Sequence, residues 1–234
     1  MSGYRPMRFP LPGIFAFVTL LWLAYAVVVG LVLTGIAVWG TVSLSVWDNA
    51  VQVALWFAFG FTAWLLYTYL PVYVANGITR REFTARVAGF VGVLAAVLAV
   101  LTAAGYLAEG GVYALAGWPQ MLAPQRYFTA ATEVPTVLLT QFLAFGAFSA
   151  VGALVGSSFY RDPALGLGSL PVGLAVLYLA NIVSGTWVAA SVGLSPFDRL
   201  PLAVAAPAGV ALIALVLGGV WLLLRNIPIR PVST

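Results

Sequence analysis

Residues 87–108, VAGFVGVLAAVLAVLTAAGYLA, form an apolar stretch without a charged side chain. An α-helix rises about 1.5 Å per residue, so this stretch is long enough to cross a hydrocarbon layer of roughly 30 Å. Five other stretches have the same character, and we predict a transmembrane helix in each of the six. The expected spans are 13–39, 51–74, 87–108, 134–157, 167–190 and 202–224.

The composition of the whole chain agrees with this interpretation. Of its 234 residues, 63% are hydrophobic and 7% are charged, and the mean hydropathy is +1.07. A chain of this composition cannot stay soluble around one core. We therefore predict an all-α polytopic membrane protein in which residues 1–234 form a single transmembrane domain, with no room for a soluble catalytic domain.

The arginines indicate how the spans are oriented. All ten cationic residues are arginine, and eight of them fall on one side of the six-span model. Because cytoplasmic loops carry the excess of positive charge, both termini are expected in the cytoplasm. The cytoplasmic set is Arg5, Arg8, Arg80, Arg81, Arg86, Arg161, Arg225 and Arg230, and the outer set is Arg126 and Arg199. These residues lie at helix ends and form no stripe, so we expect no nucleic-acid partner despite a sequence pI of 9.6.

Several function classes lack the residues they need. The chain has no cysteine and no histidine, which excludes thiolate chemistry and His-based metal sites or catalytic dyads. The predicted spans have no ionisable residue near their middle, as ion-coupled transport usually requires. No G-x-x-x-x-G-K-[ST] element is present, so the chain cannot hydrolyse ATP by the P-loop route. We predict a non-enzymatic protein without catalytic, cofactor-binding or metal-binding residues.

The connection between the second and third spans carries the strongest local signal. An Asn-Gly pair at 76–77 predicts a turn, and Thr79 and Glu82 form a T-x-x-E capping box. We therefore expect a short helix that begins at Arg80 and lies on the cytoplasmic face until the chain turns into the membrane near Val87. Phe83 is expected to face the membrane or a partner, as an anchor.

Two interpretations of this helix remain open. It is either an ordinary positive-inside loop with a good cap, or a rigid element that transmits motion from a docked protein. In both, the arginines reach solvent, headgroups or acidic residues. The residues concerned are Arg80, Arg81 and Arg86.

The stretch Asn76-Gly77-Ile78-Thr79-Arg80-Arg81-Glu82-Phe83 resembles the N-G-[IVR]-[ST]-R-R-x-[FIW] signature of ABC-2-type transporter permeases, especially small members from high-GC Gram-positive bacteria. In that family the loop forms a coupling helix that seats in the ATPase subunit. The motif covers only residues 76–83, whereas the six-span topology extends the resemblance less specifically. The resemblance implies ATPase contacts by Asn76, Gly77, Ile78, Thr79, Arg80, Arg81, Glu82, Phe83 and Arg86.

The resemblance also implies partners and a location. The chain would be a permease subunit in the bacterial cytoplasmic membrane, surrounded by lipids and paired with a second membrane subunit, identical or different. Two separate ATPase subunits would bind ATP and Mg²⁺. The scarcity of polar residues in the spans favours export of a hydrophobic, lipid-like or peptide substrate.

Two segments depart from larger members of that family. Prolines in residues 1–12 predict that the interface helix before the first span is very short or missing. The brief connection 191–201 similarly leaves little room for a re-entrant hairpin before the sixth span.

A substrate path and a helix interface are suggested inside the membrane. For the path we select Trp56, Phe59 or Phe61, and Trp64, with the amides Gln141 and Asn181. Lipid contact is the favoured alternative for the aromatic residues, and hydrogen bonds between helices explain the amides as readily as substrate contact does. The small residues Ser149, Gly152 and Gly156 predict close helix packing, either within the chain or between subunits.

Two other functions remain as alternatives. A substrate-binding subunit of the vitamin-uptake type has about six spans, and residues 109–133 would help to form its outer pocket. A non-transporting membrane scaffold would need neither a pocket nor an ATPase.

Overall fold

The computed structural model describes residues 11–186 and 200–225. These residues form six α-helices and no β-strand. Each helix is long and apolar enough to cross a membrane, which confirms the predicted all-helical, six-span fold class. The helices are α1 (Leu11–Trp39), α2 (Val46–Ala75), α3 (Arg80–Ala116), α4 (Val134–Arg161), α5 (Pro163–Ser184) and α7 (Leu202–Leu224).

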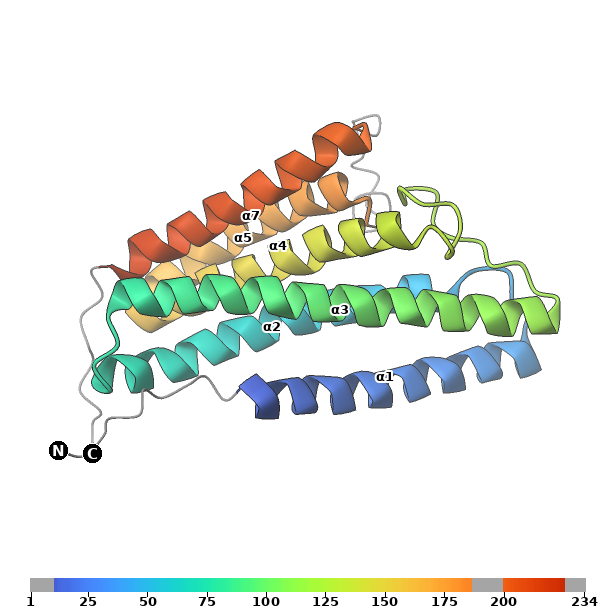
Figure 1. The fold of residues 1–234 in the computed structure, drawn as a ribbon, viewed down its shortest axis with the longest axis horizontal. Coiled ribbons are helices and arrows are strands. Elements are labelled where there is room, and N and C mark those ends of the chain that lie inside the picture. Colours follow the sequence, from blue (N-terminus) through green and yellow to red (C-terminus); the bar gives the residue numbers. More distant parts are fainter. Residues whose placement is uncertain (1–10, 187–199, 226–234) are drawn as a thin grey trace.

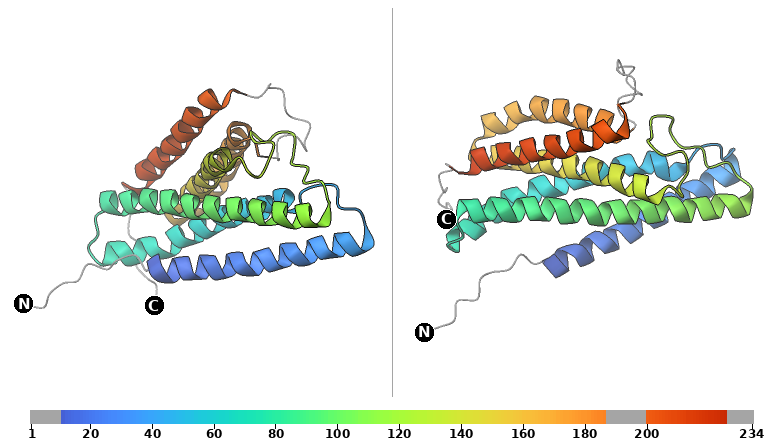
Figure 2. Two further views of the ribbon diagram at one scale, coloured as in Figure 1. Left: turned by 45° about the vertical axis from the view of Figure 1, so that its right-hand side comes forward. Right: turned by 45° about the horizontal axis from the view of Figure 1, so that its top comes forward.

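Helix α4 is the centre of the bundle. It packs against α2, α3, α5 and α7, and 78% of the residues in its most apolar stretch are buried, against 11% in α1. Helix α1 packs chiefly against α2 and runs along one side of the bundle (Figures 1 and 2). The core therefore surrounds α4, and α1 is the most exposed span.

The bundle has two chemically different ends. Helix α3 begins, and α2, α4 and α7 end, at the left of Figure 1. We call this the arginine-rich end, because the described arginines Arg80, Arg81, Arg86, Arg161 and Arg225 lie there. Three of the five described acidic residues, Asp48, Glu109 and Glu133, lie at the opposite end, together with Arg126, whereas Glu82 and Asp162 lie at the arginine-rich end.

Helix α3 corrects the expected short helix between the second and third spans. The predicted cap is present, since the Thr79 hydroxyl accepts a hydrogen bond from the backbone N–H of Glu82 at 3.2 Å. The helix that it starts is the third span itself, 37 residues long, instead of a separate element before residue 87. No glycine or proline lies between Thr79 and Val87 to end it. At about 55 Å, α3 exceeds the hydrocarbon thickness and must project beyond it.

Other boundaries also differ from those expected. Helix α2 begins at Val46 instead of 51, because Ser45 accepts the backbone N–H of Asp48 at 3.0 Å. Pro71 lies inside α2, four residues before its last residue. Helix α5 spans 163–184 instead of 167–190, between a side-chain cap at Asp162 and a left-handed Gly185 with φ +65°. Most of residues 1–12 and 191–201 lie outside the described residues. The predictions of a very short or missing interface helix and of a brief last connection both fall there.

Two glycines set the distance between α2 and α4. A Cβ at Gly152 would lie 2.2 Å from the backbone oxygen of Phe59, and one at Gly156 would lie 2.4 Å from that of Ala63. Both distances are below any van der Waals contact, so only glycine permits this approach. The buried Ser149 lies one turn before them on α4. The structure thus places the two glycines of this small-residue set at a contact within the chain.

Candidate functional site

The corner between α2 and α3 is locally rigid. Gly77 adopts φ +80°, and the backbone N–H of Ile78 donates to the Tyr73 carbonyl at 3.2 Å. The Thr79 cap then starts α3, and an ion pair of 2.6 Å joins Arg86 to Glu82 one turn further on. These contacts fix the conformation of the connecting residues without help from another chain.

The exposed part of this corner is smaller than the predicted site. Arg86 and Arg80 are half-buried, Ile78 packs against the core, and Phe83 is fully buried. The remaining predicted residues are exposed and form what we call the corner surface. It consists of Asn76, Gly77, Thr79, Arg81 and Glu82.

Phe83 does not face the membrane or a partner. Its side chain is 0% exposed, and its ring centroid lies 5.7 Å from that of Tyr73. Because α3 is continuous, Phe83 shares the inward face with the buried Val87 and Phe90 at helical spacing. The expected docking anchor is therefore part of the core.

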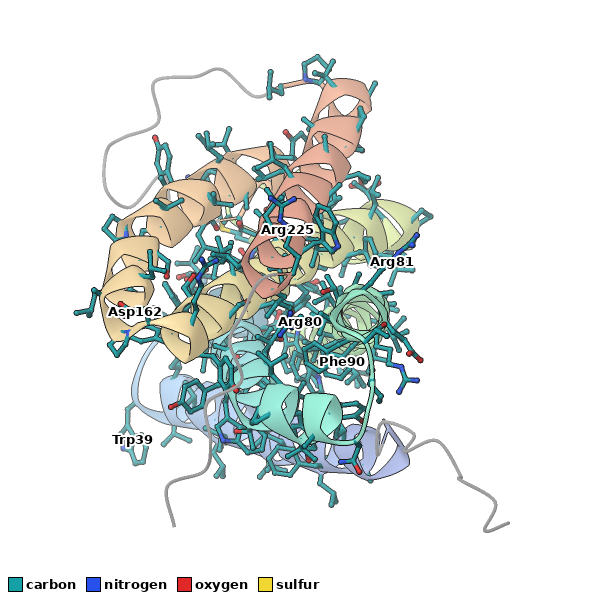
Figure 3. The ribbon with its side chains drawn as sticks, turned by 90° about the vertical axis from the view of Figure 1, so that its left-hand side faces the viewer. Trp39, Arg80, Arg81, Phe90, Asp162 and Arg225 are labelled. Carbon is teal, nitrogen blue, oxygen red and sulfur yellow. The ribbon has the colours of Figure 1, made fainter. Side chains whose placement is uncertain are left out.

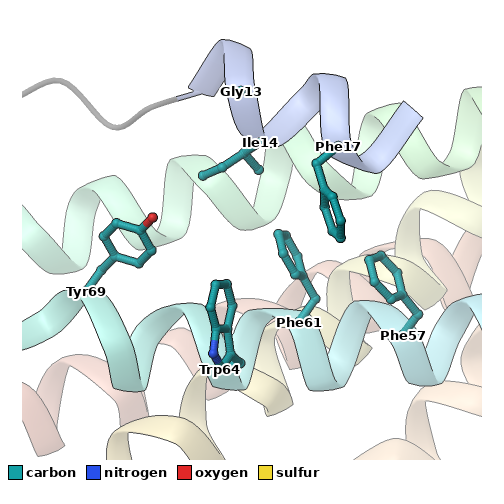
Figure 4. Close-up of a pocket in the computed structure, with 7 residues that line it drawn as sticks. All are labelled: Gly13, Ile14, Phe17, Phe57, Phe61, Trp64 and Tyr69. Carbon is teal, nitrogen blue, oxygen red and sulfur yellow. The ribbon is translucent and has the colours of Figure 1, made fainter. Parts of the chain in front are cut away.

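An apolar groove runs between α1 and α2. Its main cavity has a volume of about 560 Å³, and Figure 4 shows the aromatic side chains that surround it. The rings of Phe17 and Phe61 stack across it with centroids 6.2 Å apart. The lining residues are Gly13, Ile14, Phe17, Phe57, Phe61, Trp64 and Tyr69.

Only part of the predicted substrate path lines this groove. Phe61 and Trp64 line it. Trp56 instead contacts Phe148 of α4, with ring centroids 5.5 Å apart, and also contacts Phe59. The aromatic residues selected for the path therefore lie on two different faces of α2.

The two predicted amides lie deep in the bundle. Gln141 is fully buried, and neither atom of its amide has a hydrogen-bond partner among the described residues. Asn181 donates to the Leu177 carbonyl at 2.7 Å and accepts from the Thr186 hydroxyl. Neither lines the α1–α2 groove, so the six predicted path residues do not share one cavity.

A buried ion pair, which the sequence did not predict, lies at the opposite end. Arg126 Nε lies 2.7 Å from Asp48 Oδ1, and the two side chains are 3% and 5% exposed. The Tyr106 hydroxyl donates to the same oxygen at 2.5 Å, and the backbone N–H of Ala123 donates to Oδ2 at 2.9 Å. The Asp48 carboxylate thereby joins α2, α3 and the connection before α4.

A second carboxylate reinforces this connection. Glu109 accepts the backbone N–H of Trp47 at 2.8 Å and the side-chain amide of Gln120 at 2.9 Å. It also accepts the hydroxyl of Ser45. We refer to Ser45, Asp48, Tyr106, Glu109, Gln120 and Arg126 as the polar cluster.

Two sequence signals pointed to the polar cluster. Ser45 and Asp48 have the spacing of a capping box, which would have started α2 earlier and placed Asp48 inside a helix. Thr102, Tyr106 and Glu109 continue the helical spacing of the third span past its expected end. The pairing with Arg126 had no local signal, because 78 residues separate it from Asp48.

No protein-family model, curated protein or solved structure matches this chain. In residues 11–186 and 200–225, no three His, Cys, Asp or Glu side chains are grouped so that they could hold a metal ion. The candidate functional features of the described residues are therefore the corner surface, the groove and the polar cluster.

Proposed function

We propose that the chain is a permease subunit of an ABC transporter, driven by two separate ATPase subunits that dock on the corner surface. A second membrane subunit completes the transport path, and the chain itself performs no chemistry. The observation that carries the proposal is an exposed, capped corner that leads without interruption into a 37-residue helix.

This geometry suits mechanical coupling. A force applied at Arg81 acts on the first turn of α3, and a continuous helix transmits displacement along its axis. At the far end, Tyr106 and Glu109 bind α2 through Asp48 and Trp47. Helices α2 and α3 are therefore tied at both ends and move as a pair. ATP-driven closure of the ATPase subunits shifts the population between inward-open and outward-open arrangements of this pair.

The α1–α2 groove supports a hydrophobic substrate. Its walls are aromatic and aliphatic, and α1, which forms one side of it, is the least buried span. An amphipathic or lipid-like molecule can enter such a groove from the bilayer without crossing the packed core around α4. A small hydrophilic ion would find few polar groups there.

The test is co-purification of the tagged chain with a candidate P-loop ATPase from the same organism. Arg81→Glu reverses an exposed charge of the corner surface and leaves the buried face of α3 intact. We expect roughly tenfold weaker ATPase binding, the factor for about 1.4 kcal/mol. Ala164→Glu is the control, because it also places a carboxylate at an exposed position of the same end, in α5, with a charge change of one unit instead of two.

Undiminished ATPase recovery with Arg81→Glu, at unchanged turnover, would refute docking at the corner surface. Failure of the wild-type chain to retain any ATPase would refute the permease proposal as a whole.

A further inference from the structure

Arginines from two other spans hold the end of α7. Arg80 Nη1, at the start of α3, donates to the backbone carbonyl of Arg225 at 3.3 Å. Arg161 Nη1, at the end of α4, donates to the carbonyl of Leu223 at 3.5 Å. The last carbonyls of a helix lack partners within it, and the helix dipole favours cations there. Together with Arg225 itself, three arginines therefore lie around the end of α7.

The third arginine is next to a large aromatic ring. Arg225 follows the last residue of α7, and its Cζ lies 5.5 Å from the centroid of the Trp221 ring. Figure 3 looks onto this end of the bundle and labels Arg80, Arg81, Arg225 and Asp162 there. Arginine and tryptophan at the ends of spans lie at the depth of the lipid headgroups.

The positive charge of Arg80 and Arg225 is not neutralised within the described residues. Neither guanidinium forms an ion pair there. Among the described residues, two carboxylates lie at this end, and both have other partners. Glu82 pairs with Arg86 at 2.6 Å, and Asp162 accepts the first backbone N–H groups of α5. A guanidinium has five N–H donors, and Arg80 uses one of them on the Arg225 carbonyl.

We infer that Arg80 and Arg225 bind the phosphate of an anionic phospholipid. A guanidinium matches two phosphate oxygens at once, and basic pockets between spans are suited to anionic headgroups. A phosphate between the two side chains also relieves their mutual repulsion. Arg161 acts as a positioning residue, because its bond to Leu223 holds the end of α7 in place.

The surface next to the arginines selects a lipid over a soluble anion. Trp221 and Leu222 are 42% and 50% exposed, and Leu215, further into the span, is 71% exposed. An acyl chain can cover this apolar surface of α7 while its headgroup remains at the arginines. A free phosphate would leave the surface uncovered.

The test measures thermal unfolding of the detergent-purified chain during titration with dioleoylphosphatidylglycerol. A ligand that binds only the folded state stabilises it by RT ln(1 + [L]/Kd), so the rise of the Tm with lipid concentration gives an apparent Kd. We expect this lipid to raise the Tm and dioleoylphosphatidylcholine to leave it unchanged. Arg80→Gln and Arg225→Gln should each raise this apparent Kd about fivefold, the usual effect of one arginine near anionic lipid.

Arg81→Gln is the matched control. Arg81 is the next residue of the same helix, it is exposed, and no bond to α7 involves it; we expect a change of less than about twofold. If Arg80→Gln fails to fold, Arg225→Gln carries the test, because no described residue accepts a hydrogen bond from its guanidinium.

Three results would overturn the inference. Equal losses in all three variants would mean a diffuse charge effect, and equal stabilisation by the zwitterionic lipid would remove the role of headgroup charge. Stabilisation of the same size by inorganic phosphate would mean a free-anion site. The measurement needs no ATPase, so its outcome is independent of the proposed function.

Discussion

Removing Arg126 should destabilise the chain strongly, because its partner would remain buried. Asp48 is 5% exposed. Its carboxylate accepts hydrogen bonds from the Arg126 side chain, the Tyr106 hydroxyl and the backbone N–H of Ala123. Arg126→Met keeps much of the side-chain length but leaves the carboxylate without its counter-ion. Breaking a buried ion pair on one side costs about 3–5 kcal/mol, and we expect a loss of this size in the free energy of unfolding.

A double-mutant cycle, measured by unfolding in mixed micelles, gives the coupling energy between Asp48 and Arg126. Asp48→Asn removes the charge and retains the shape, so it should offset part of the damage caused by Arg126→Met. We expect a coupling energy of about 2 kcal/mol between the two positions, within the range for residues in direct contact. Arg81→Met, at an exposed arginine, should change stability by less than about 0.5 kcal/mol.

Additive effects of Asp48→Asn and Arg126→Met would refute the reasoning, since independent sites have no coupling energy. A cost below about 1 kcal/mol for Arg126→Met would refute it as well, because that is the cost of an exposed pair.

Three further predictions concern single positions. Gly152→Ala should cost about 1–3 kcal/mol in the same unfolding assay, because its Cβ would overlap the backbone oxygen of Phe59, whereas Gly60→Ala, with open space around its Cβ, should be neutral or stabilising. Phe83→Ala should cost about 3–5 kcal/mol, since the side chain is fully buried; unchanged stability would restore its role as a docking anchor. Hydrogen bonds from the backbone and hydroxyl of Thr129 lower the pKa of Glu133 below 4.5, so its stabilising contribution is complete above pH 4.5 and is lost as the pH falls through the lowered pKa. The protection factors of the amides in the 129–133 turn, which are exchange rates corrected for their intrinsic pH dependence, should therefore fall in acid, and Glu133→Gln should abolish this fall.

The sequence predicted features that depend on neighbouring residues. Long apolar stretches and the arginine distribution predicted the six spans, and the Thr79 cap was placed at the correct residue. The separate short helix was wrong because a capping box marks where a helix begins and contains no information about its end. Once α3 is continuous, the orientation of Phe83 follows from helical periodicity.

Features that depend on distant residues could not be predicted in this way. Arg126 reaches Asp48 only because the connection before α4 folds back over α2 and α3. Which aromatic residues of α2 face the groove and which face α4 depends on where α1 and α4 pack around α2. The arginines around α7 likewise come from the ends of three different spans.

The central position of α4 has a consequence for biosynthesis. Spans enter the membrane in chain order, but α2 and α3 bury much of their surface only against α4, which is made after them. The hairpin of α2 and α3 is therefore in the membrane before α4 is made. Until then, the surface of α2 that packs against Gly152 and Gly156 has no protein partner. The time needed to translate residues 117–161 therefore sets a lower limit on how long these surfaces of α2 and α3 lack their α4 partner.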